Sequence, residues 1–408
     1  MKNIYLIRAL VIAGFMLSIS TLTNGQNSSG WRGDDRDDKV NGFKTPAKWP
    51  EQLNKIWQIT VGAADATPVL MNSKIYLHVK VDSSEVLLCI DANKGTELWR
   101  TILNPAPEVT GPAMGHPGPR STPFLTKGKL YTLGINGILT CTEAETGKID
   151  WQNKSYIAEV PQFFTACSPL VFDNKCIVQL GGKNSGIIVA FDANTGKEIW
   201  KIEGEPCTYS SPVLMKSLDN MLLVQSETNL LGVSKDGKVL WRISTPNQQR
   251  FYSSSTPVFD GKNIILTGQG TGTKAYSLNL VDGKWDPTEI WNNAALGVSF
   301  CTPLIKEGFL YANEAKSGSL FCMNMKTGEK AWANTNMLNR FASIVDLGKV
   351  LVSLPAKGPL FVFEPNSTSY VELAQYKVSD SDVYAHPLFL GNKIFIKDQD
   401  KLTCWAVE

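Results

Sequence analysis

The sequence has 408 residues, of which 43% are hydrophobic and 10% aromatic, and its formal net charge at pH 7 is +2. A charge this close to neutral argues against the basic surface that nucleic-acid binding requires, so we expect no nucleic-acid partner and no strongly acidic one. Ordinary domain sizes would allow two or three domains, but an internal repeat favours a single one.

The first 25 residues have the pattern of a secretory signal peptide. Lys2 and Arg8 supply a positive start, residues 9–17 are small or apolar, and residues 23–25 offer small side chains for cleavage. A membrane anchor is the alternative, but the apolar part is shorter than the about 20 residues that span a bilayer. Because the first cysteine is Cys89, we expect a periplasmic or secreted protein without a lipid anchor or a transmembrane segment.

Residues 26–54 form an N-terminal arm before the repeats begin. We interpret its charged run from Asp34 to Asp38 as a solvated surface segment. Residues 55–60 then match the pattern of an outer strand, although no turn precedes them. This strand needs a partner from elsewhere in the chain.

The motif Gly-x-x-x-Trp recurs along the rest of the sequence. Each glycine stands in a polar turn between two short apolar runs, where it supplies the positive φ of a hairpin turn. Repetition at a period of about 40–50 residues is typical of a β-propeller with one four-stranded blade per repeat. The five copies are Gly95–Trp99, Gly147–Trp151, Gly196–Trp200, Gly237–Trp241 and Gly328–Trp332.

A second marker, a small or hydroxyl residue before proline, gives the number of blades. Proline is tolerated at the first residue of a strand, so each copy is expected to open the innermost strand of a blade. Residues 342–344 form a degenerate eighth copy without proline. The other seven are Thr67-Pro68, Thr122-Pro123, Ser168-Pro169, Ser211-Pro212, Thr256-Pro257, Thr302-Pro303 and His386-Pro387.

The two ends of the chain predict how the ring closes. The last repeat stops at Trp405 before an outer strand can form, whereas residues 55–60 are an outer strand without a repeat. We therefore predict an all-β, eight-bladed propeller domain over residues 55–408 with four-stranded antiparallel blades. The strand at about residues 55–60 pairs into the C-terminal blade and removes the exposed edges.

The repeated tryptophans have a structural interpretation. A large ring on an outer strand fills the wedge between blades, while its N–H reaches a backbone acceptor. We interpret seven of them as structural staples between blades: Trp57, Trp99, Trp151, Trp200, Trp241, Trp291 and Trp332.

The segments Ile90–Trp99 and Phe191–Trp200 resemble the repeat named after pyrroloquinoline quinone (PQQ), and the resemblance extends over residues 31–408. The chain is thus similar to PQQ-like propellers, a family related in shape to the outer-membrane assembly factor BamB and to quinoprotein alcohol dehydrogenases. The resemblance implies the fold but not a cofactor, because the glycine and tryptophan positions build the blades rather than a site.

The dehydrogenases of this family imply a pair of adjacent cysteines against the quinone and a Glu, Asn and Asp set that holds calcium. This chain has no adjacent cysteines, and no such ordered set matches it; its three histidines also lack metal-ligand spacing. We expect no PQQ, no calcium, no other metal and no catalytic residue. The family's assembly factor implies a lipid anchor and partner-binding loops, which have no counterpart here.

One group of side chains points to binding. The residues just before each strand-opening proline should gather at one mouth of the central channel. Arginines beside aromatic rings there suit an anionic or polar ligand; the alternative is that they only line a wet channel. The candidate ligand- or partner-binding residues are Asp65, His116, Arg120, Tyr209, Arg250, Tyr252, Arg340, Tyr384 and His386.

The sequence therefore predicts an exported, non-catalytic binding or scaffold propeller, expected to be a monomer. Its partner is a small polar or anionic ligand, or an envelope protein. Two alternatives stay open: a quinone-dependent oxidoreductase acting on an alcohol or sugar, and a BamB-like factor for outer-membrane protein assembly.

Overall fold

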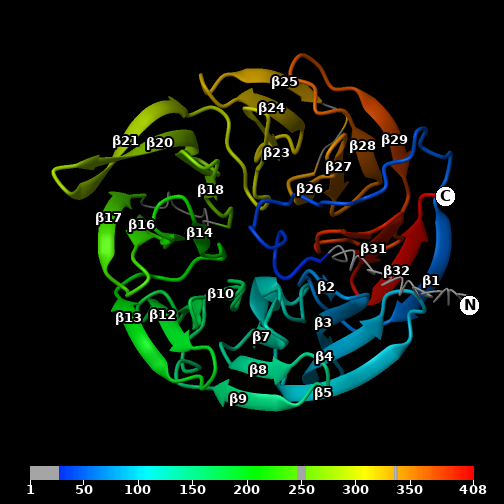
Figure 1. Ribbon diagram of the computed structural model, residues 1–408, viewed down its shortest axis with the longest axis horizontal. Helices are drawn as coiled ribbons and strands as arrows, with labels where there is room; N and C mark the ends of the chain where they lie inside the picture. The colour runs from blue at the N-terminus through cyan, green and yellow to red at the C-terminus, as the bar shows by residue number, and fades with distance from the viewer. Residues whose placement is uncertain (1–26, 246–253, 335, 337–338) are drawn as a thin grey trace, which may run out of the picture.

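The computed structural model describes residues 27–245, 254–334, 336 and 339–408. These residues form eight four-stranded sheets arranged as blades around a central channel (Figure 1), which confirms the predicted eight-bladed propeller. The helical structure of the described residues is limited to one short turn, η1 (Gly111–Ala113), and none of it is long and apolar enough to cross a membrane. The expected signal peptide lies outside the described residues.

The blades are named here in chain order, each from its innermost strand outward. Blade 1 is β2 (Val69–Met71), β3 (Lys74–Val81), β4 (Ser84–Asp91) and β5 (Glu97–Pro105). Blade 2 is β6 (Phe124–Thr126), β7 (Lys129–Leu133), β8 (Leu139–Glu143) and β9 (Ile149–Asn153). Blade 3 is β10 (Leu170–Phe172), β11 (Lys175–Leu180), β12 (Ile187–Asp192) and β13 (Glu198–Glu203). Blade 4 is β14 (Val213–Met215), β15 (Met221–Gln225), β16 (Asn229–Val233) and β17 (Val239–Ser244).

The second half of the ring repeats this order. Blade 5 is β18 (Val258–Phe259), β19 (Asn263–Gly268), β20 (Gly272–Val281) and β21 (Lys284–Asn293). Blade 6 is β22 (Leu304–Lys306), β23 (Phe309–Asn313), β24 (Leu320–Asn324) and β25 (Lys330–Asn334). Blade 7 is β26 (Ala342–Asp346), β27 (Leu351–Pro355), β28 (Leu360–Phe363) and β29 (Glu372–Tyr376). Blade 8 is β30 (Leu388–Leu390), β31 (Lys393–Lys397), β32 (Lys401–Ala406) and β1 (Asn54–Thr60).

The ring closes as predicted, with the first strand of the chain completing the last blade. β1 pairs antiparallel with β32, from Asn54 opposite Ala406 to Thr60 opposite Lys401. The first and last strands therefore lie side by side in blade 8 (Figure 1). This pairing gives β32 the outer neighbour that its own repeat lacks.

The tryptophan rings of one blade cover the turn glycines of the next. A Cβ atom built on Gly196 would lie 2.5 Å from the ring of Trp151, so only glycine fits there. Four other junctions repeat this contact: Trp57 on Gly95, Trp99 on Gly147, Trp200 on Gly237 and Trp291 on Gly328. The indole N–H groups of Trp99, Trp151, Trp200, Trp291 and Trp332 donate to backbone carbonyls of the next blade at 2.8–3.2 Å.

The junction between blades 4 and 5 departs from this pattern. Trp241 is buried, its ring lies against Gly232, and its N–H points at the sulfur of Met221 at 3.1 Å. It packs in one cluster with residues of blades 4 and 5 but covers no turn glycine of blade 5. The hairpin of β20 and β21 has ten residues per strand and extends beyond the ring (Figure 1). Its glycine, Gly283, has nothing within 4 Å of a built Cβ. The insertion thus moves this turn away from the preceding tryptophan.

The N-terminal arm crosses the centre of the ring (Figure 1). Our interpretation of its charged run as a solvated surface segment is therefore wrong for Arg36 and Asp38, which are buried, although Asp34 and Asp35 are exposed. Arg36 is 4% exposed and donates to the carbonyl oxygens of Pro212 at 2.7 Å, Ser168 at 3.1 Å and Pro169. Backbone carbonyls that face a channel need donors. The N-terminal arm supplies one such donor, the Arg36 guanidinium, from a segment whose charged sequence predicts exposure to solvent.

Candidate functional site at the channel mouth

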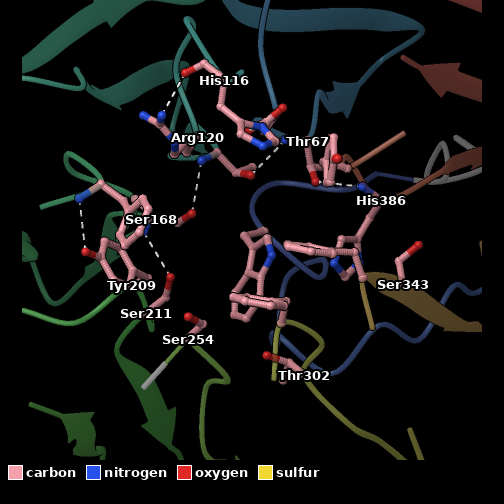
Figure 2. A pocket seen from close by; sticks show the side chains of 18 of the residues that line it. Thr67, His116, Arg120, Ser168, Tyr209, Ser211, Ser254, Thr302, Ser343 and His386 are labelled. Carbon is pink, nitrogen blue, oxygen red and sulfur yellow. Dashed lines mark hydrogen bonds and ion pairs between the residues drawn. The ribbon is translucent and has the colours of Figure 1, made fainter. Parts of the chain in front are cut away.

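A cavity of about 520 Å³ opens at one mouth of the channel (Figure 2), within the range of about 300–1,000 Å³ that holds small organic ligands. Its wall is built largely by the segments that lead from the outermost strand of one blade to the innermost strand of the next, so all eight blades contribute. Besides small apolar residues, the lining comprises Trp31, Asp65, Thr67, His116, Arg120, Thr122, Phe163, Ser168, Tyr209, Ser211, Ser254, Gln269, Ser299, Phe300, Thr302, Phe341, Ser343, Tyr384 and His386.

A chain of hydrogen bonds joins the innermost strands around this cavity. In six of the seven copies with proline, the backbone N–H of the residue before the proline donates to the hydroxyl of the corresponding residue in the next blade, at 2.9–3.0 Å. The six bonds lead from His386 to Thr67, and on to Thr122, Ser168, Ser211, Thr256 and Thr302. Ser343, the copy without proline, takes no part, and its buried Oγ has no partner among the described residues. The hydroxyl before proline therefore links blades as well as opening strands.

The arm forms the floor of the cavity. Trp31 lines it, and the guanidinium of Arg32 lies 5.6 Å from the Trp31 ring. Arg32 also pairs with Asp38 and donates to the Pro303 carbonyl at 2.6 Å, and His386 Nδ1 lies 2.9 Å from Asp38 Oδ1. Burial alone would raise the pKa of Asp38, but the partners His386 and Arg32 hold it below its ordinary value. A buried ion-pair network thus fixes the floor to the wall.

A charged cluster stands on one side of the cavity. His116 Nδ1 lies 2.7 Å from Asp65 Oδ2, and this bond raises the pKa of His116 above its ordinary value. Arg120 donates through Nη2 to the His116 carbonyl at 2.7 Å and lies 5.9 Å from the centre of the Phe164 ring. Its Nη1 is buried without a partner among the described residues. Burial lowers the pKa of Arg120, as expected for a cation short of acceptors.

Aromatic rings form much of the remaining wall. Phe300 and Phe341 stack with their centres 4.1 Å apart and their planes 1° from parallel, and Tyr384 meets Phe341 edge-on at 5.3 Å. Phe163 and Tyr209 form a second edge-on pair, at 5.9 Å. Phe300 remains 42% exposed although it is large and apolar. The cavity therefore combines apolar ring faces with hydroxyl groups and one guanidinium.

The structure brings six of the nine predicted mouth residues into this one cavity: Asp65, His116, Arg120, Tyr209, Tyr384 and His386. Arg340 is exposed and does not line it, while Arg250 and Tyr252 lie outside the described residues. That the six bind a ligand stays a prediction. The sequence did not lead us to predict Trp31 or the hydroxyl-bearing residues as part of the cavity wall. The second marker could have suggested the hydroxyls, because it placed one in nearly every blade at the same level.

Fold and cavity together define a PQQ-like propeller with a ligand-sized space at its channel mouth. The chain belongs to the family whose model is described as outer membrane protein assembly factor BamB, which matches residues 82–334. It is 21% identical over 349 residues to BamB of Shewanella oneidensis, with 81% of each chain covered. It is 23% identical over 272 residues to methanol dehydrogenase subunit 1 of Methylorubrum extorquens, covering 60% of this chain but 40% of that protein. The chain thus spans less than half the length of this dehydrogenase.

Solved structures show the same fold at low identity. Quinohemoprotein alcohol dehydrogenase from Comamonas testosteroni has a TM-score of 0.71 and 15% identity, covering 94% of this chain and 80% of its own. BamB from Moraxella catarrhalis has a TM-score of 0.64 and 14% identity, covering 87% and 97%. The propeller is common to enzymes and to an assembly factor, so the fold does not decide between them.

The residues of the cavity do not fit the calcium ion that our sequence analysis associated with the dehydrogenases of this family. Calcium takes six to eight oxygen ligands, yet Asp65 is the one carboxylate in the cavity wall and it is bonded to His116. Among the described residues, no three His, Cys, Asp or Glu side chains are grouped to hold a metal ion. We therefore derive no catalytic step through a metal ion.

Proposed function

We propose that this protein is a non-catalytic binding protein of the cell envelope that holds a small polar or anionic ligand in its channel-mouth cavity. The observation that carries the proposal is Arg120, whose Nη1 is buried in the described structure without an acceptor. A guanidinium without an acceptor is costly to bury, and a carboxylate or phosphate oxygen would supply one. The envelope location rests on the signal-like first 25 residues and on relatives named as outer-membrane assembly factors.

Saturation-transfer NMR with benzoate, citrate and gluconate tests the proposal. These probes share a carboxylate and differ in the rest of the molecule, so at least one should bind the wild-type protein. Arg120→Gln should abolish its signal. Arg340→Gln is the matched control, since this arginine is exposed and lies outside the cavity lining. Signals that are absent from the wild type, or unchanged by Arg120→Gln, would refute an anion site at Arg120.

The second candidate is a BamB-like role in outer-membrane protein assembly. It is favoured by the alignment with BamB of Shewanella oneidensis, which covers 81% of both chains. Affinity purification from envelope extract of the producing organism should then recover outer-membrane assembly proteins with the wild type. The Arg120→Gln variant should recover them equally if the partner binds a blade face, and poorly if it binds the mouth. Recovery of none of them would count against this candidate.

A further inference from the structure

The chemistry of the cavity wall identifies a class of ligand. Five hydroxyl groups, from Thr67, Thr122, Ser168, Ser211 and Thr302, line the cavity. Each accepts one backbone N–H in the chain of bonds around the channel. In the part of the chain that the structure describes, none of the five donates its own hydrogen. Each hydroxyl therefore has a hydrogen and a lone pair left for a ligand.

Hydroxyl groups therefore recur around the circumference of the cavity. The five hydroxyls come from five blades at the same level, and Ser343 of blade 7, whose Oγ has no partner among the described residues, adds a sixth. Figure 2 shows hydroxyl-bearing residues distributed around the cavity rather than gathered on one wall. A ligand with one or two polar atoms would leave most of them unused. The complementary ligand carries many groups that both donate and accept, spread over its circumference.

The aromatic rings require that this ligand also has apolar surface. Phe300 and Phe341, which stack on each other, line the cavity together with Trp31. The negative face of an aromatic ring attracts C–H groups that carry partial positive charge. A pyranose ring has such C–H groups on its faces and hydroxyl groups around its rim. Saccharides match both features of the cavity at once.

The charged cluster adds the last requirement. Arg120 lacks an acceptor at Nη1, while His116 is paired with Asp65. The guanidinium of Arg120 therefore has an N–H group without an acceptor, beside the aromatic rings and the hydroxyl groups. We propose that the mouth cavity binds a saccharide that carries an acidic group, with the carboxylate on Arg120 and the sugar ring against the aromatic wall. This inference rests on the proposed binding function and names the ligand class of the same site.

A planar aromatic acid is the main competing ligand. It would stack on Phe300 and Phe341 and reach Arg120, but it would leave the circle of hydroxyls without partners. A buried donor that loses water without gaining a partner lowers affinity. The hydroxyl groups therefore favour the saccharide.

Isothermal titration calorimetry with disaccharides of glucuronate, galacturonate and mannuronate, their neutral parents, and naphthoate tests this inference. At least one uronate should bind the wild type about tenfold or more tightly than its neutral parent, since a charge-assisted hydrogen bond is lost. Arg120→Gln should remove that difference, and Phe341→Ala should weaken the uronate and its parent alike. Arg340→Gln should retain the wild-type affinities. Thermal unfolding of each variant checks that it is folded.

The possible failures are distinguishable. Binding of naphthoate through Arg120 without any uronate would overturn the saccharide and leave the proposed function intact. Equal binding of acidic and neutral sugars would overturn the role of the acidic group. If none of these probes binds, nor benzoate, citrate or gluconate, the proposed function fails together with this inference.

Discussion

The two ends of the central channel use arginine in different ways. Beneath the cavity, Arg36 of the arm is surrounded by backbone and donates to three carbonyl oxygens. At the mouth, Arg120 donates to one carbonyl and lines the cavity. Buried nitrogens without a partner among the described residues occur at both ends: Nη1 of Arg120 at the mouth, and Nη1 of Arg32 and Nε of Arg36 in the arm. The two ends therefore differ in that Arg36 satisfies three backbone carbonyls, whereas Arg120 satisfies one and borders a ligand-sized space.

The sharpest way to break this comparison is to remove each arginine in turn. Arg36→Met leaves three buried carbonyls without their donor, and we expect the free energy of unfolding to fall by about 3 kcal/mol. Arg120→Met loses one hydrogen bond, and the expected loss is about 1 kcal/mol. Urea denaturation of both variants measures the difference. Equal losses would mean that the two ends do not differ in this way.

The chain of hydroxyl bonds offers a matched pair of smaller changes. Ser211→Ala removes the acceptor of the Ser168 N–H, which is buried, and should cost about 1.5 kcal/mol. Ser343→Ala removes a buried hydroxyl that has no partner among the described residues, and should change stability by less than about 0.5 kcal/mol. Both are read from thermal unfolding. A large loss from Ser343→Ala would reveal a partner for its hydroxyl.

The smallest expected effect concerns pH. Because Asp65 raises the pKa of His116 in the folded protein, the pair stabilises the fold fully below the unfolded histidine pKa of about 6.5. That contribution is lost as the pH rises through the folded value. The pair is partly exposed, so wild type and Asp65→Asn should differ by about 1 kcal/mol at pH 5.5 and by less at pH 9. A gap that widens with pH would contradict this assignment, and His116→Gln should show no such trend.

The fold could be predicted from the sequence because its repeated glycine and proline residues are required by the local backbone conformation. Glycine at position 196 is required by a positive φ of 68° and by the Trp151 ring above it. Proline lies directly before the innermost strand of seven blades, where its missing N–H removes no ladder bond. Trp241 is the exception to the pattern of rings on turn glycines. The motif that ends at Trp241 does not show that the β20–β21 hairpin of the next blade is longer than the others and carries its turn glycine, Gly283, away from the ring.

The site was only partly predictable, because many of its contacts join residues that are far apart in the sequence. Nothing near Arg36 in the sequence indicates that its acceptors are the carbonyls of Pro169 and Pro212, well over a hundred residues away. Arg340 follows the same positional rule as Arg120 but is exposed and outside the cavity lining. Position before an inner strand gives the level of a residue along the channel axis. It does not give the direction of its side chain.

The pairing of β1 with β32 means that the first strand of the protein depends on the last strand for its neighbour. Asn54 finds Ala406 only after the whole sequence has been synthesised, and bringing such remote segments together is slow. The arm differs from β1 in this respect, because Arg36 has its partners in blades 3 and 4 and Arg32 has one in blade 6, all of which are made before the last repeat. A chain that ends before residue 401 would have seven complete blades, an unclosed gap and a strand with no neighbour.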